Sequence, residues 1–343
     1  MSIRALLKTI GYPGKSGTDH QASEELYTLA RRNKIGSLYV QSLNDADAIG
    51  DLGEKLENRQ DFQQRVTRTV EGLAADVPDH YQYAVVKSNH EFWADSKDVD
   101  IVLFDDNLMS LKQDFTDAGY EFIGDSPTTF DVMHPETKIQ IDAQSDFSLQ
   151  NVVYFDKHTI ADNVTMRNVR GTKVPVAARP DDLALIVIHS VTEQLFILKE
   201  YYAALYALEN FSRAEFDRFV RTVEANDIEP ACRAFFPVVA AITQEIFGRQ
   251  PPYMQELLHR YPPYERETRA FFQNGMTTPH RYMRQTGLRT IIGKVDNEVF
   301  LRSLISQVPR LARPDTLTHI GKELLTRRER EHYVHDTSDM ETQ

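Results

Sequence analysis

The sequence predicts an α+β protein in which a small mixed β-sheet lies between a helical N-terminal region and a helical C-terminal domain. Apolar residues recur at helical spacing over most of 20–76, and again from Pro180 onward. Between these stretches, from Tyr81, short runs rich in β-branched and aromatic residues alternate with one helical segment. This order indicates a sheet with helices packed on one face. At 343 residues, the chain is long enough for two or three subdomains.

Two helices are expected before the sheet. The first covers 20–44, and the second covers 52–76 and is polar over most of its surface. Pro78 and Asp79 then interrupt the helical pattern. The residues whose spacing marks the first helix are Leu26, Leu29, Ala30, Ile35, Leu38 and Tyr39.

The expected sheet region combines short extended segments with one helix. Asp105, Asp106 and Asn107 are suitable capping residues for a helix that runs to Ala118, and Gly119 is a natural stop. The expected strands cover 83–87, 98–104, 120–123 and 138–142.

Helices are expected throughout the C-terminal part of the chain. Residues 181–210 carry a long apolar series, Ser212 and Glu215 form a capping-box pattern that starts another helix, and 231–247 form a third. The expected divisions are a helical region at 1–78, a sheet core at 79–180, a helical domain at 181–312 and a charged tail at 313–343.

The composition excludes several classes of protein. The net charge of −12 argues against nonspecific nucleic-acid binding over the whole surface, although it permits a local basic groove. Cys232 is the only cysteine, which excludes an intrachain disulfide and a multi-cysteine zinc site. No apolar run reaches the ~20 residues needed to cross a bilayer, and the N-terminus lacks a signal-peptide pattern. We therefore expect a cytoplasmic protein with no membrane partner.

The main chemical signal is a set of three aspartates. Asp98 and Asp100 are two residues apart on an expected strand, so their side chains point to the same side of the sheet. Asp142 ends a later strand in which apolar residues alternate in the same way. Carboxylates this close repel one another unless a cation lies between them, and hard oxygen ligands suit Mg²⁺. If the two strands pair, three carboxylates would hold two ions, Mg²⁺ or alternatively Mn²⁺.

These residues and their surroundings resemble the nucleotidyltransferase superfamily related to DNA polymerase beta. The elements that carry the resemblance are the turn Val86-Lys87-Ser88, the strand 98–102, the helix end Ala118-Gly119-Tyr120, and His134 followed by the strand 139–142. Nine residues separate Ser88 from Asp98, which is within the spacing of the family motif. The nearest likeness is to a stand-alone prokaryotic branch, and it covers roughly residues 20–210.

The resemblance implies an enzyme that moves NMP from an NTP to a hydroxyl acceptor on a small molecule, a protein or an RNA. It implies that Asp98, Asp100 and Asp142 are catalytic metal ligands. Lys87 and Ser88 would meet the phosphates, and Lys199 matches a lysine that the family often carries on the helix after the sheet.

One departure from the family pattern leaves an alternative open. The family turn normally carries a glycine beside the serine, whereas Lys87 and Asn89 flank Ser88 here. The alternative is therefore a catalytically inactive binding or scaffold protein with the same fold. A metal-dependent phosphohydrolase is a third reading, and interleaved Arg and Tyr residues over 260–289 are compatible with RNA binding. The acceptor, the preferred NTP and the oligomeric state do not follow from the sequence.

Overall fold

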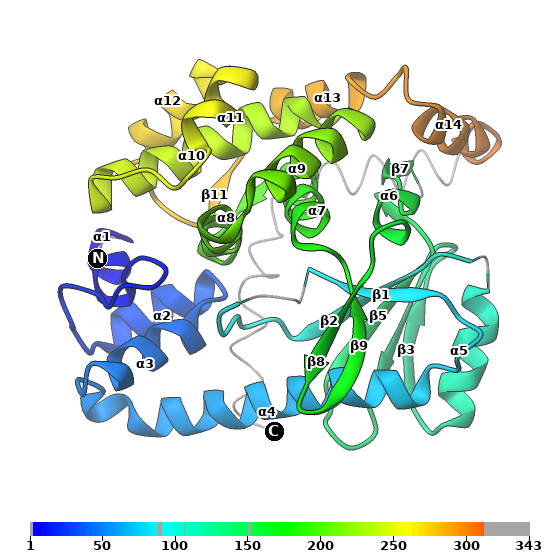
Figure 1. Cartoon of the computed structure of the whole chain (residues 1–343), viewed down its shortest axis with the longest axis horizontal. Coiled ribbons are helices and arrows are strands. Elements are labelled where there is room, and N and C mark those ends of the chain that lie inside the picture. The colour runs from blue at the N-terminus through cyan, green and yellow to red at the C-terminus, as the bar shows by residue number, and fades with distance from the viewer. Residues whose placement is uncertain (1–2, 88–90, 106, 150–151, 312–343) are drawn as a thin grey trace.

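The computed structural model describes residues 3–87, 91–105, 107–149 and 152–311, and it confirms the predicted α+β class (Figure 1). A mixed sheet lies beside the N-terminal helices, and the long helix α4 (Gly53–Asp76) runs beneath both. The C-terminal helices form a layer above the sheet and the N-terminal helices (Figure 1). No helix in the described part of the chain has both the length and the apolar character that a bilayer crossing requires.

The sheet has seven strands among the described residues, in the order β3-β4-β5-β2-β1-β9-β8. β2 runs parallel to β5, and β1 runs parallel to β9, while the other neighbouring strands are antiparallel. The strands are β1 (Tyr83–Val86), β2 (Asp98–Leu103), β3 (Glu121–Asp125), β4 (Thr129–Met133), β5 (Gln140–Gln144), β8 (Thr165–Val169) and β9 (Thr172–Val176).

One face of the sheet is apolar and is covered by α4 and α5 (Leu108–Asp117). Val99 and Ile101 of β2 and Ile141 of β5 are fully buried there, in one cluster with Leu73 of α4 and Phe115 of α5. Because side chains alternate along a strand, residues 98, 100 and 142 point to the opposite face. Packing of the apolar face thus fixes the side on which the aspartates lie.

The opposite face of the sheet is turned toward the C-terminal helices. Ala84, Val86 and Val102 on this face belong to the same buried cluster as Leu183 of α7 and Leu205 of α8. The C-terminal helices are α7 (Arg179–Thr192), α8 (Leu198–Asn210), α9 (Arg213–Ala225), α10 (Glu229–Phe247), α11 (Met254–Arg260), α12 (Glu265–Gln273), α13 (Arg284–Ile292) and α14 (Glu298–Leu311). Short elements complete the described chain: α1 (Ile3–Ile10), η1 (Gly50–Leu52), α6 (His158–Ala161), and the small sheets of β6 (Phe147–Leu149) with β7 (Val152–Phe155) and of β10 (Leu195–Phe196) with β11 (His280–Arg281).

Two predicted helices are each interrupted. The helix expected over 20–44 is two helices, α2 (Glu24–Arg32) and α3 (Gly36–Asp45), because Lys34 adopts a left-handed conformation with φ 55°. The helix expected over 181–210 ends at Thr192, turns through Gln194 at φ 57°, and restarts as α8 after β10. The predicted charged tail at 313–343 lies outside the described residues.

Candidate functional site

The strand register brings the three predicted aspartates together on one face of the sheet. Asp100 of β2 lies directly beside Asp142 of β5, and Asp98 lies beside Gln140 of the same strand. Since β2 and β5 are parallel and in register, Asp100 and Asp142 point to the same side. A fourth carboxylate, Asp131 of β4, is paired with Asp142 across the next ladder. Sequence reasoning missed Asp131, because the alternating run around it covers only five residues and gives a weak strand signal.

Burial and mutual repulsion alter the proton affinity of these carboxyls. Burial, with a further contribution from the charge of Asp100, raises the pKa of Asp142 to about 8. Burial also raises the pKa of Asp100, against the opposing charge of nearby Lys87. The pKa of Asp131 is raised by burial as well. Such a group of carboxyls is stabilised by any cation that enters it.

Lys87 supplies a positive charge within this group. It follows β1, has a φ of 51°, and places its Nζ 2.6 Å from Oδ1 of Asp100. Its backbone N–H donates to Oδ1 of Asp182 on α7, at 2.7 Å, so the turn is held from the C-terminal domain. Burial opposes the charge of Lys87, but Asp100 and its neighbours dominate and raise the pKa of the lysine. Burial raises the pKa of Asp182 itself to about 7.

Lys199, in the first turn of α8, is a second lysine whose charge acts on the aspartates. Its Nζ donates to Oγ of the buried Ser96 at 2.8 Å. Burial and the positive charge of Lys34 lower the pKa of Lys199. Although burial alone would raise the pKa of Asp98, Lys34 and Lys199 hold it below its ordinary value. Lys34 was not singled out from the sequence, where it falls within the helix expected over 20–44.

Tyr154 of β7 and His189 of α7 lie near Lys87, whose charge acts on both. The Tyr154 hydroxyl lies 3.2 Å from Nδ1 of His189. Burial lowers the pKa of His189 well below its ordinary value, and Lys87 and Lys199 add to this effect. The sequence favoured a core role for His189, and the neutral ring beside a tyrosine agrees with that role. Burial also raises the pKa of Tyr154, so its hydroxyl keeps its proton at neutral pH.

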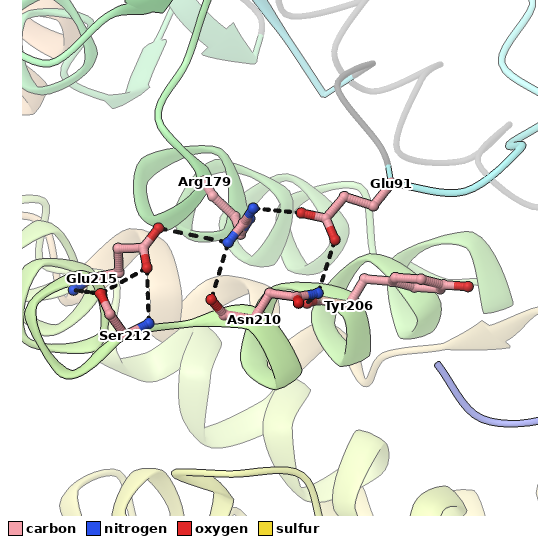
Figure 2. A network of polar contacts seen from close by, with 6 residues as sticks. All are labelled: Glu91, Arg179, Tyr206, Asn210, Ser212 and Glu215. Carbon is pink, nitrogen blue, oxygen red and sulfur yellow. Dashed lines mark hydrogen bonds and ion pairs between the residues drawn. The ribbon is translucent and has the colours of Figure 1, made fainter. Parts of the chain in front are cut away.

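The loop that enters β2 is fastened to the C-terminal domain by a polar network (Figure 2). Arg179, at the start of α7, forms an ion pair with Glu91 at 2.5 Å and donates to the backbone oxygen of Asn210 at 3.1 Å. Asn210 in turn donates to Glu91 at 2.8 Å, and Glu215 lies 3.6 Å from Arg179. The predicted phosphate-binding residue Ser88 lies outside the described residues, just before this anchored segment.

The arrangement and the donor atoms of the carboxylate group decide how well it fits a divalent cation. In the described part of the chain, no set of three or more His, Cys, Asp or Glu side chains is arranged as a ready-made metal site. One oxygen of Asp100 is instead taken by the ammonium of Lys87. The donor set still has the chemistry that Mg²⁺ prefers, because it consists of carboxylate oxygens. Oδ1 of Asp142 is buried and makes no hydrogen bond, and a buried acceptor of this kind requires a partner.

The arginine-rich segment that suggested RNA binding is partly engaged in contacts within the protein. Arg260 forms an ion pair with Glu224 at 3.0 Å. The guanidinium of Arg289 lies 5.0 Å from the centre of the Tyr264 ring. These contacts are the ordinary surface interactions expected of a helical face.

No protein-family model and no curated protein matches the chain by sequence. The solved structures that are similar to about half of it include the following two. One is the crystal structure of an antigenic nucleotidyltransferase-like protein from Paracoccidioides brasiliensis, which is 16% identical and has a TM-score of 0.31; the match covers 49% of this chain and 92% of that one. The other is the solution structure of the antibiotic-resistance factor ANT(2'')-Ia, which is 8% identical and has a TM-score of 0.33, with coverage of 48% and 93%. At this level of likeness, function has to rest on the geometry of the site itself.

Proposed function

We propose that the protein is a metal-dependent nucleotidyltransferase that moves NMP from an NTP to a hydroxyl acceptor. The observation that carries the proposal is the in-register pairing of Asp100 with Asp142, with Asp98 on the same face and an unpartnered oxygen on Asp142. Residues 79–180 would form the catalytic core. The acceptor hydroxyl would belong to a small molecule, a protein or an RNA.

In this proposal the aspartates hold two Mg²⁺ or Mn²⁺ ions. Asp98, Asp100 and Asp142 would be the ligands, and Asp131 would carry a further negative charge beside them. When bound, the ions neutralise charge on the phosphates and lower the pKa of the acceptor hydroxyl. Lys87 would exchange its contact with Asp100 for a phosphate oxygen, which frees the carboxylate for the ion.

The remaining groups would bind and orient the substrate. Lys199 already lies beside Asp98, and its ammonium would bind phosphate oxygens together with Ser88. Tyr154, which keeps its proton, would be a hydrogen-bond donor near Lys87. Positioning and charge neutralisation of this kind supply most of the catalysis in phosphoryl and nucleotidyl transfer.

The test is transfer of label from each α-³²P NTP, with Mg²⁺ or Mn²⁺, to a mixture of cellular RNA and protein. We expect label in one acceptor class with the wild-type protein, and at least a ~100-fold loss in Asp100→Ala. Asp79→Ala, at an exposed aspartate just after α4, is the matched control and should keep full activity. Absence of transfer to any acceptor, with NTP binding retained, would instead identify a binding or scaffold protein. Equal activity of Asp100→Ala and wild type would refute the proposed site.

A further inference from the structure

A turn in the N-terminal helical region reaches the carboxylate site. The turn joins α2 to α3 at residues 33–35, and Lys34 at its centre has a φ of 55°. Among the charges around Asp98, that of Lys34 acts on it most strongly, ahead of that of Lys199. Lys34 and Lys199 also repel each other. Lys34 and Lys199, from distant parts of the sequence, are therefore both near enough to Asp98 for their charges to act on it.

The turn is held in place by its neighbours on both sides. The backbone oxygen of Asn33 accepts from the N–H of Lys199 at 3.1 Å, and its side-chain oxygen accepts from the N–H of Leu198 at 3.2 Å. The N–H of Asp95 donates to the backbone oxygen of Lys34 at 3.0 Å. These bonds tie Lys34 to the start of α8 and to the segment that enters β2.

Asp95 also fixes the start of α3 immediately after Lys34. Its buried carboxylate accepts from the N–H of Gly36 at 2.6 Å and from the N–H of Ser37 at 3.1 Å. The N–H groups of the first helical turn have no partner within the helix, so they are available to the Asp95 carboxylate. The helix dipole also favours a negative charge at this end of the helix. The hydrogen bonds among these three segments therefore fix the backbone at Lys34. In this respect Lys34 differs from an ordinary solvated surface lysine.

The two ammonium groups lack anionic partners in direct contact. Among the described residues, no carboxylate lies within ion-pair distance of Lys34 or Lys199, and the recorded contact of the Lys199 ammonium is the Ser96 hydroxyl. Both charges act on Asp98 without a direct ion pair to it among the described residues, so the ammonium groups keep N–H donors for a second anion. Because the whole protein carries a net charge of −12, an anionic substrate needs such a local positive field to approach the aspartates.

We propose that Lys34 and Lys199 together bind the phosphate chain of a nucleoside triphosphate, so that the N-terminal helical region forms part of the nucleotide site. The proposal rests on the nucleotidyltransferase function proposed above. Lysine suits this role as a compact charge that binds phosphate oxygens without a fixed geometry.

The test is isothermal titration of the full chain with ATP, inorganic tripolyphosphate and AMP, each in MgCl₂. We expect the wild type to bind ATP and tripolyphosphate. Lys34→Met should weaken both by about tenfold or more, with little effect on AMP, and Lys34→Arg should remain within about threefold of wild type. Lys173→Met, at an exposed lysine on β9, is the matched control and should bind as the wild type does.

Three results separate this inference from the function on which it rests. Tripolyphosphate binding that is unchanged in a folded Lys34→Met variant, or absent from the wild type, would overturn the inference. Lys34→Asn should weaken the binding of ATP and tripolyphosphate in the same way. Because asparagine tolerates the positive φ of the turn, this variant replaces Lys34→Met if the methionine variant fails to fold. Binding through Lys34 without any nucleotide transfer by the wild type would refute the proposed function and leave the lysine pair as a phosphate site.

Discussion

Replacing Lys87 tests whether this lysine holds the carboxylate group together in the absence of metal. Its ammonium lies 2.6 Å from Asp100, and the two side chains are only 13% and 9% exposed. Removing one partner of a buried ion pair leaves an uncompensated charge and costs about 3–5 kcal/mol. Lys87→Met keeps the aliphatic stem and has no charge, so it should lower the free energy of unfolding by that amount in metal-free buffer.

A double-mutant cycle separates the ion pair from other effects of the substitution. Urea unfolding is measured in EDTA for wild type, Lys87→Met, Asp100→Asn and the double variant. In the Asp100→Asn background the lysine has lost its main partner, so Lys87→Met should cost less than half of what it costs in the wild type. Lys173→Met on the surface should change stability by less than about 0.5 kcal/mol. Equal costs of Lys87→Met in both backgrounds would show that the pair is not coupled and would refute this reasoning.

The same variant has a second signature when Mg²⁺ is added. Loss of the ammonium frees an oxygen of Asp100, so the metal should stabilise Lys87→Met more than it stabilises the wild type. Because Mg²⁺ binds the folded state alone, it raises the free energy of unfolding of the variant. At a metal concentration of ~100 times the Kd of the variant, this stabilisation is about 2.7 kcal/mol. A smaller effect of Mg²⁺ on the variant than on the wild type would contradict the idea that Lys87 and the ion compete.

Two further predictions concern buried charges in the C-terminal part of the chain. Burial lowers the pKa of Lys294 from 10.5 to about 8. Between these values the unfolded chain binds more protons, so the lysine contributes stability that grows as pH rises through this window, by up to about 3 kcal/mol. Unfolding curves at pH 7.5 and pH 10 should therefore show a larger gain in the wild type than in Lys294→Met, and equal gains would be evidence against it. Arg218→Met should cost about 3–5 kcal/mol at pH 7, because the carboxylate of Asp181, which is 0% exposed, loses its ion-pair partner. Among the described residues, its remaining side-chain hydrogen bond is with Thr222 at 2.7 Å. A cost below ~1 kcal/mol in thermal unfolding would contradict this prediction.

The parts of the fold that the sequence predicts are those set by local pattern. Alternating apolar residues predicted β2 and most of β5, and with them the face on which Asp98 and Asp142 lie. The capping box at Ser212 was also correct, because both of its hydrogen bonds are local. β4 was not predicted, since its five residues include Asp131 and give too short an alternation to stand out.

The interruptions in the helices depend on contacts between distant segments. Helical spacing continues through Asn33 and Lys34, and α3 starts where it does because Asp95, from the sheet region, binds the free N–H groups of its first turn. A turn of this kind is specified by tertiary structure, so local periodicity passes over it. For the same reason, the sequence placed Lys199 near the site by family resemblance but gave no indication of Lys34.

The central claim is that Asp98, Asp100 and Asp142 form one site for divalent cations with the nucleotide. Mn²⁺ binding, measured by electron paramagnetic resonance in the presence of ATP, tests it most directly. We expect Asp142→Asn, which keeps the size of the side chain and removes one ligand charge, to weaken Mn²⁺ binding by about tenfold or more, and Asp79→Asn to have no effect. Mn²⁺ binding of Asp142→Asn at wild-type affinity would show that the metal lies elsewhere and would contradict the account.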